Sequence, residues 1–155
     1  MTRLTNVISI DASPGTVWAI VADLGALADY DPTVKAVEVT CGARAGQGAT
    51  RRVTMRDGKH WFEERLAALE PDASLTYELT ACNFPIARLQ HTYTFAHQNG
   101  STVVTQVMEY TPKFGWAGRL LDAAMLRRGF NAGVIAFLGG LKARSEGPTP
   151  AADAR

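Results

Sequence analysis

Apolar residues recur every three to four positions from Phe114 to Arg144, near the C-terminus. This spacing is typical of an amphipathic helix, which carries its apolar side chains along one face. The residues that follow the pattern are Trp116, Leu120, Leu121, Ala124, Met125, Phe130, Val134, Ile135, Leu138 and Leu141. A second stripe, of small residues, consists of Gly129, Ala132, Gly133, Ala136, Gly140 and Ala143. Because each glycine weakens a helix by roughly 1 kcal/mol relative to alanine, we expect tertiary packing to hold this helix.

The chain before this helix alternates between apolar and polar residues, which is the pattern of β-strands. Strands are expected over residues 4–10, 34–40, 50–56, 61–69, 75–79, 86–97 and 102–110. Asp57-Gly58 and Asn99-Gly100 predict tight hairpin turns, which join antiparallel strands. Two short helices are expected after the first strand. One begins at Pro14 with Ser13 as its cap, and the other covers about residues 26–30.

These elements predict a single antiparallel sheet with the long helix across it. Strands joined by tight turns build such a sheet, and one of its faces has to be covered. A sheet of this length also twists and coils. The expected fold class is α+β: a curved seven-stranded antiparallel sheet wrapped on a long C-terminal helix, with two short helices after the first strand. The space between sheet and helix is a place to hold a ligand.

Length and composition fit one domain, because 155 residues that are 46% hydrophobic can form one sizeable core. We assign this domain to residues 1–144 and expect residues 145–155, rich in proline and alanine, to form a disordered tail. The net charge of +1 argues against nucleic-acid binding, which usually requires a basic surface. The N-terminus lacks the basic start and apolar core of a signal peptide, so we expect a cytoplasmic protein.

The sequence carries none of the common cofactor or metal motifs. It has no phosphate-binding loop, no G-x-G-x-x-G after a strand, no H-E-x-x-H and no G-x-S-x-G. Cys41 and Cys82 stand far apart and fit no zinc or redox spacing. We therefore predict no metal and no cofactor. Any reaction would have to use acid–base chemistry, as in an aldol-type cyclisation, a dehydration or an isomerisation.

Several short stretches, taken together in their order along the chain, carry a resemblance to known proteins. They are residues 13–18 (SPGTVW), 30–35 (YDPTVK), 64–66 (ERL) with 70–72 (EPD), and 100–104 (GSTVV). Together they resemble the START/Bet v 1-like (SRPBCC) superfamily of polyketide cyclase/dehydrase and lipid-transport domains, over residues 4–144. The resemblance implies the helix-grip fold, in which the sheet wraps around the C-terminal helix. It also implies that the partner is a small hydrophobic, aromatic or polyketide-like molecule.

Two branches of this superfamily suggest site residues. In the abscisic acid receptors of plants a lysine and a glutamate face the cavity, and the matching positions here are Lys35 and Glu64. In enzymes of the lachrymatory-factor synthase type an arginine and a glutamate carry the chemistry, and those positions resemble Arg51 and Glu64. The receptors' gate and latch loops are replaced here by residues 56–60 and 83–86, so hormone reception is not supported.

Strand alternation by itself also places Arg51 and Glu64 on the inner face of the sheet. Arg51 alternates with Val53 and Met55, and Glu64 alternates with Phe62. A buried arginine and a buried glutamate must pair, because either charge alone is costly in an apolar site. The bland interpretation is a structural ion pair, or a bulge that turns one side chain to solvent. The functional interpretation makes Glu64 a general acid or base, with Arg51 keeping it ionised or stabilising an enolate.

The remaining inward positions are the predicted ligand contacts. His91 is either a core or wall residue whose hydrogen bonds are made within the protein, or a hydrogen-bond partner of the ligand. Gln106 either contacts the ligand or forms hydrogen bonds with nearby backbone. The candidate catalytic residues are thus Glu64 and Arg51. The candidate ligand-binding residues are Lys35, Val53, Met55, Phe62, Tyr77, Leu79, Leu89, His91, Tyr93, Gln106, Met108, Leu121 and Met125.

Three functions remain open. The first, which we rank highest because it requires only a cavity, is a carrier or sensor that encloses a small hydrophobic molecule. The second is an enzyme similar to polyketide cyclases and dehydratases. The third is a homodimeric interaction module that uses the small residues Ala132, Gly133, Ala136 and Gly140. A variant of the third places Arg127, Arg128, Lys142 and Arg144 at a membrane surface.

Overall fold

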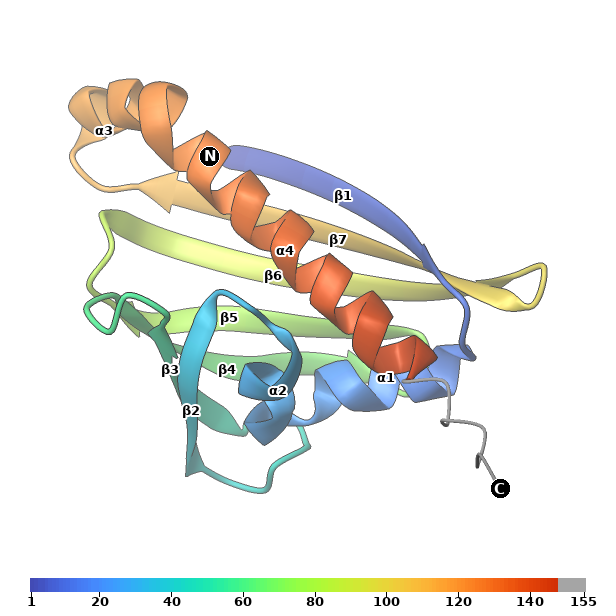
Figure 1. Ribbon diagram of the computed structural model, residues 1–155. Helices are drawn as coiled ribbons and strands as arrows, with labels where there is room; N and C mark the ends of the chain where they lie inside the picture. Colours follow the sequence, from blue (N-terminus) through green and yellow to red (C-terminus); the bar gives the residue numbers. More distant parts are fainter. Residues whose placement is uncertain (148–155) are drawn as a thin grey trace, which may run out of the picture.

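A computed structural model describes residues 1–147, in which a long helix crosses the concave face of one curved sheet (Figure 1). The strands are β1 (Thr2–Ile10), β2 (Val34–Cys41), β3 (Thr50–Met55), β4 (Trp61–Glu70), β5 (Ser74–Cys82), β6 (Ile86–Gln98) and β7 (Ser101–Pro112). They form one seven-stranded sheet in the order β1-β7-β6-β5-β4-β3-β2. The predicted curved antiparallel sheet and its C-terminal helix are confirmed.

From β2 to β7 the chain runs up and down across the sheet, because each strand pairs with the next one. The hairpin residues predicted from the sequence make the turns. Gly58 has a φ of 69°, and Asn99 and Gly100 have φ values of 50° and 82°, the left-handed conformations that tight hairpins require. β1 pairs with β7 at one edge of the sheet, whereas β2 forms the other edge. The segment between them therefore has to cross the fold.

Short helices make that crossing: α1 (Pro14–Ala22), a 3₁₀ turn (Leu24–Ala26) and α2 (Leu27–Tyr30). Ser13 caps α1 as expected, since its side chain accepts a hydrogen bond from the Thr16 amide at 3.3 Å. The buried face of α1 carries Val17 and Val21. These helices contact both the sheet and the C-terminal helix, and they close one end of the apolar core.

The C-terminal helix runs from Gly115 to Glu146 with one change of pitch. α3 (Gly115–Leu121) leads into a π-helical segment (Asp122–Leu126), which continues as α4 (Arg127–Glu146). α4 buries Val134, Phe137, Leu138 and Leu141. Residues 145 and 146 are helical, so the helix extends two residues past the predicted domain end at residue 144. The rest of the predicted tail, residues 148–155, lies outside the described residues.

The apolar stripe predicted for this helix is buried mainly in its C-terminal half. Trp116, Leu120 and Met125 are 77%, 63% and 66% exposed, and Ile135 is also exposed. Two features explain the difference. α3 projects past the end of β7, where the sheet does not cover it (Figure 1). The π-helical segment also adds a residue to its turn, which rotates later residues relative to earlier ones.

Candidate functional site

A pocket of about 640 Å³, which we call the central pocket, lies between the sheet and the C-terminal helix. Its walls come from α2, from strands β3 to β7 and from the helix. The residues that line it are Leu27, Asp31, Thr33, Arg51, Met55, Phe62, Glu64, Leu79, Cys82, Phe84, Ile86, Leu89, His91, Tyr93, Met108, Met125, Leu126, Gly129, Phe130, Ala132, Gly133, Val134 and Phe137. Most of them are apolar. The volume falls within the roughly 300–1,000 Å³ of typical small-molecule sites.

The small residues of α4 make room for this pocket. Gly129 and Gly133 line it, and a Cβ atom added at either position would meet no other atom within 4 Å. Gly140 serves a different purpose, because a Cβ atom there would lie 1.8 Å from the carbonyl oxygen of Tyr30. The missing side chain thus lets α4 approach α2 closely. Gly133 and Gly140, which we expected on a homodimer surface, therefore face the interior.

Arg51 and Glu64 form a buried ion pair in the pocket wall, because β3 and β4 place them directly opposite each other. Glu64 Oε1 accepts a hydrogen bond from Nε of Arg51 at 2.8 Å and lies 2.6 Å from Nη2 in the ion pair. The two residues are 4% and 3% exposed. Arg51 Nη1 donates to the carbonyl oxygen of Leu24 at 3.1 Å, and the guanidinium lies 4.5 Å from the centre of the Tyr77 ring. Three sets of contacts therefore hold the arginine in place.

The surroundings of the pair keep Arg51 charged and Tyr77 neutral. Burial lowers the pKa of Arg51, but the Glu64 carboxylate outweighs burial and holds that pKa above its usual value. Burial raises the pKa of Tyr77 to about 12, although Arg51 opposes the shift. The Tyr77 hydroxyl donates to the carbonyl oxygen of Val21 at 2.7 Å. Within residues 1–147, Glu64 Oε2 accepts no hydrogen bond, so one carboxylate oxygen is left for a ligand.

His91 is the second polar group in the wall, and a buried glutamine sets its orientation. Gln106 Nε2 lies 2.9 Å from His91 Nδ1. With the amide donating, Nδ1 accepts and the neutral ring carries its proton on Nε2. Burial lowers the pKa of His91, so the ring is neutral at pH 7. The imidazole stacks on Tyr93 at a centroid distance of 6.2 Å. His91 therefore offers the pocket a fixed hydrogen-bond donor.

Asp31 and Thr33, just after α2, add a polar corner that the sequence did not predict. Asp31 Oδ1 accepts hydrogen bonds from the Thr33 amide at 2.9 Å and from the Thr33 hydroxyl at 2.7 Å. Burial raises the pKa of Asp31, and the two hydrogen bonds from Thr33 oppose that shift. Asp31 is one of the few buried acidic residues. Because both hydrogen bonds to its Oδ1 atom come from Thr33, two residues further along, its carboxylate mainly stabilises the turn after α2.

Aromatic side chains pack against one another beside the pocket, at the end where β5 turns into β6. Phe84, in that turn, stacks on His60 of the β3–β4 hairpin, with ring centres 5.1 Å apart. Phe84 also packs edge-on against Phe130 of α4 at 6.3 Å. Phe130 in turn contacts Tyr110 of β7 at 5.0 Å. Two hairpin turns and the helix thus meet across this end.

Several of the sequence-predicted site residues lie together in the central pocket. They are Arg51, Met55, Phe62, Glu64, Leu79, Leu89, His91, Tyr93, Met108 and Met125. Two more stand behind its wall: Tyr77 beneath Arg51 and Gln106 behind His91. Val53 is fully buried in the core and does not reach the pocket.

Lys35 and Leu121 are corrections. A register shift between Val34 and Ala36 interrupts the alternation of β2, so Val34 is buried and Lys35 points to solvent. Leu121 belongs to α3 and is partly exposed, away from the lining residues. Neither side chain lines the central pocket. The bulge in β2 turns Lys35 outward, and the position of α3 keeps Leu121 out of the pocket wall.

The pocket residues that the sequence analysis missed come from three places. They are Leu27, Asp31 and Thr33 around α2, Cys82, Phe84 and Ile86 around the β5–β6 turn, and Leu126, Gly129, Phe130, Ala132, Gly133, Val134 and Phe137 of the helix. Only the helix carried a signal, because its uncharged run with repeated glycines was already unusual. The other two groups lie in turns or at the ends of the short elements beside them, where the side-chain directions follow no regular period.

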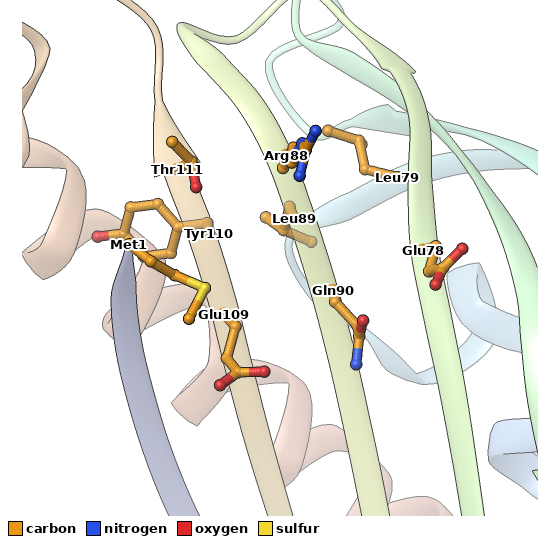
Figure 2. A pocket seen from close by; sticks show the side chains of 9 residues that line it. All are labelled: Met1, Glu78, Leu79, Arg88, Leu89, Gln90, Glu109, Tyr110 and Thr111. Carbon is orange, nitrogen blue, oxygen red and sulfur yellow. The ribbon is translucent and has the colours of Figure 1, made fainter. Parts of the chain in front are cut away.

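A second pocket of about 410 Å³, the outer pocket, has both polar and apolar lining residues and includes the point where β5 and β6 separate. These strands pair only as far as Glu78 and Gln90, although both continue beyond that point. Figure 2 shows Glu78 and Leu79 on one side of the gap and Arg88, Leu89 and Gln90 on the other. Leu79 and Leu89 line both pockets. The central pocket therefore comes close to the outer face of the sheet at this gap.

Residues 1–147 bring no three His, Cys, Asp or Glu side chains together in a way that would hold a metal ion. Within the same residues, no helix combines the length and the apolar character needed to cross a lipid bilayer.

Solved structures with the same fold include proteins of several kinds. An aromatase/cyclase called ZhuI, from Streptomyces sp. R1128, has a TM-score of 0.75 and 16% identity, over 94% of this chain and 93% of its own. A START superfamily protein from Mycobacterium smegmatis has a TM-score of 0.71 and 15% identity, over 90% and 96% of the two chains. The major latex-like protein 151 of Panax ginseng has a TM-score of 0.75 and 11% identity, over 93% and 97%. At these identities the likeness establishes the fold.

The sequence itself identifies the family. A search of curated proteins gave no match. A family model described as polyketide cyclase / dehydrase and lipid transport, however, matches residues 1–146. This match covers nearly the whole chain and agrees with the helix-grip fold and with the START/Bet v 1-like neighbours. The chain therefore belongs to the polyketide cyclase / dehydrase and lipid transport family.

Proposed function

We propose that this protein binds one small, largely apolar molecule in the central pocket and acts as a carrier or sensor of it. The observation that supports this function is the pocket itself: about 640 Å³, walled by aliphatic and aromatic side chains, with few polar groups. Burial of apolar ligand surface in such a pocket supplies most of the binding free energy. The family description, which includes lipid transport, agrees with a ligand of this class.

The polar groups in the wall suggest which part of the ligand they contact. Glu64 Oε2 accepts no hydrogen bond within residues 1–147, and His91 carries its proton on Nε2 when the Gln106 amide donates to Nδ1. A ligand that carries a hydroxyl group and a carbonyl group would satisfy both. The apolar remainder would lie along Phe130, Val134 and Phe137 of α4. We therefore propose an oxygenated apolar molecule, such as a polyketide-like aromatic compound.

Native mass spectrometry of the protein purified from its own host tests this function directly. A retained apolar molecule at one per chain is the expected result. The proposal would be contradicted if the protein is purified without a bound molecule and also fails to bind anilinonaphthalene sulfonate in a fluorescence titration. The probe is needed because a weakly held ligand is lost during purification.

One observation favours a second candidate, an acid–base enzyme. Glu64 is buried, is oriented by Arg51 and keeps one free oxygen within the pocket, which are the requirements for a general base. ZhuI, which shares the fold, is an aromatase/cyclase. Glu64→Gln keeps the size of the side chain but removes the base. In the enzyme case this variant should bind the retained molecule yet lose its turnover, and unchanged turnover would exclude Glu64 as the base.

A further inference from the structure

The start of the C-terminal helix carries a cluster of large apolar side chains on the surface. Phe114, Trp116, Leu120 and Met125 are 72%, 77%, 63% and 66% exposed. Trp116 and Leu120 are four residues apart within α3, so they lie side by side on one face of it. Single exposed apolar residues are ordinary, but a group of this size marks an interaction site. We call these four residues the apolar tip.

The exposed charged residues of the segment 113–128 all carry a positive charge. Lys113, Arg119, Arg127 and Arg128 are exposed and make no salt bridge within residues 1–147. The acid of this segment, Asp122, is buried and accepts hydrogen bonds from the hydroxyl groups of Thr2 and Tyr110. The surface around the tip is therefore apolar in its centre and basic at its rim.

We propose that the apolar tip docks on the surface of an anionic lipid bilayer. Trp and Phe insert readily at the headgroup level, and arginine and lysine beside them bind lipid phosphate groups. A second copy of the chain fits less well, because a symmetric contact through the tip would bring like charges together. Lys142, which we first grouped with the membrane-facing arginines, is not part of this surface, since it donates to the Ser9 carbonyl oxygen and pairs with Glu146.

The tip also adjoins the central pocket. Met125 is 66% exposed and lines that pocket, and Leu126 and Gly129 follow it on the same wall. Docking through the tip therefore brings the pocket's helical wall to the bilayer, where an apolar ligand is most concentrated. The docking surface itself is independent of what the pocket holds.

Vesicle binding tests the proposal with the full chain, by co-sedimentation with phosphatidylcholine vesicles that do or do not contain phosphatidylglycerol. The chain should bind the anionic vesicles and dissociate from them at high salt, and it should not bind the neutral vesicles. The double variant Trp116→Ser/Leu120→Ser should bind about tenfold more weakly or worse, because two apolar side chains no longer enter the interface. Replacing Arg119 and Arg127 with glutamine should weaken vesicle binding about fivefold for each charge that is removed.

Matched controls make the same kinds of change outside the tip. Ile135→Ser removes another exposed apolar side chain, and Arg144→Gln removes another exposed cation of the same helix; both should bind vesicles like the native chain. Gly133→Leu, which fills the pocket, should also bind vesicles normally. The proposal is overturned if the native chain ignores anionic vesicles or if the controls lose as much binding as the tip variants. Light scattering that shows a dimer, lost in the double variant, would assign the tip to a second copy instead.

Discussion

Gly133 offers the most direct test of the central pocket as a binding site. A Cβ atom at Gly133 would meet no other atom within 4 Å, and Gly133 lines the pocket, so a leucine there extends into its space. Gly139 is a matched control on the same helix. It also has no atom within 4 Å of an added Cβ, but it is exposed and does not line the pocket. The two leucine variants therefore differ mainly in whether the new side chain occupies the pocket.

The expected magnitudes separate binding from stability. Replacing a helical glycine with leucine gains up to about 1 kcal/mol of helix propensity, which for a domain of this size raises Tm by roughly 2–4 °C. Both variants should show this gain. A side chain that competes with the ligand for space costs about 1–3 kcal/mol, which is roughly 5- to 150-fold in Kd. Only Gly133→Leu should show that loss.

The assay pairs thermal melting with a fluorescence titration of anilinonaphthalene sulfonate. The titration is repeated in the Trp116→Ser/Leu120→Ser background, which removes probe binding at the exposed tip. Gly133→Leu with native affinity for the probe would show that ligands bind elsewhere. An equal loss of affinity in Gly139→Leu would show that the effect is general to the helix, and either result would refute the reasoning.

Three further predictions concern the buried ion pair, the contact between α4 and α2, and the buried histidine. Arg51→Met leaves the Glu64 carboxylate buried without its partner, so the free energy of unfolding should fall by about 3–5 kcal/mol in a urea titration; a drop no larger in this variant than in Arg51→Met/Glu64→Gln would contradict the pairing. Gly140→Ala forces a Cβ atom onto a carbonyl oxygen of α2 and should destabilise the chain, whereas Gly139→Ala should stabilise it; melting temperatures that rise in both would contradict the close approach. Burial lowers the pKa of His91 in the folded state, so its contribution to stability is present above the unfolded pKa of about 6.5 and is lost as pH falls through the lowered value. Urea titrations across that pH range should show the loss in the native chain and a flatter profile in His91→Gln, and equal slopes would exclude His91 as the source.

The elements of the fold follow from local patterns in the sequence. Hairpin residues such as Asp57-Gly58 and Asn99-Gly100 determine their turns by backbone conformation alone, and Ser13 caps its helix through a contact three residues away. Arg51 and Glu64 were predictable for a similar reason. β3 and β4 pair without a register shift along their shared length, so the alternation of each strand gives the correct face.

Tertiary structure decided what lies between these elements. The bulge in β2 turned Lys35 outward, and no pattern within that strand signals such an irregularity. Whether a glycine of α4 opens a pocket, as Gly133 does, or permits close packing, as Gly140 does, depends on which surface lies opposite. The apolar residues of α3 fit a helical period as well as those of α4, but the sheet ends before it reaches them. The sequence thus determined which segments form strands and helices, because those choices depend on neighbours along the chain. The pocket and the exposed tip depend on distances between segments far apart in the sequence, which only the folded chain defines.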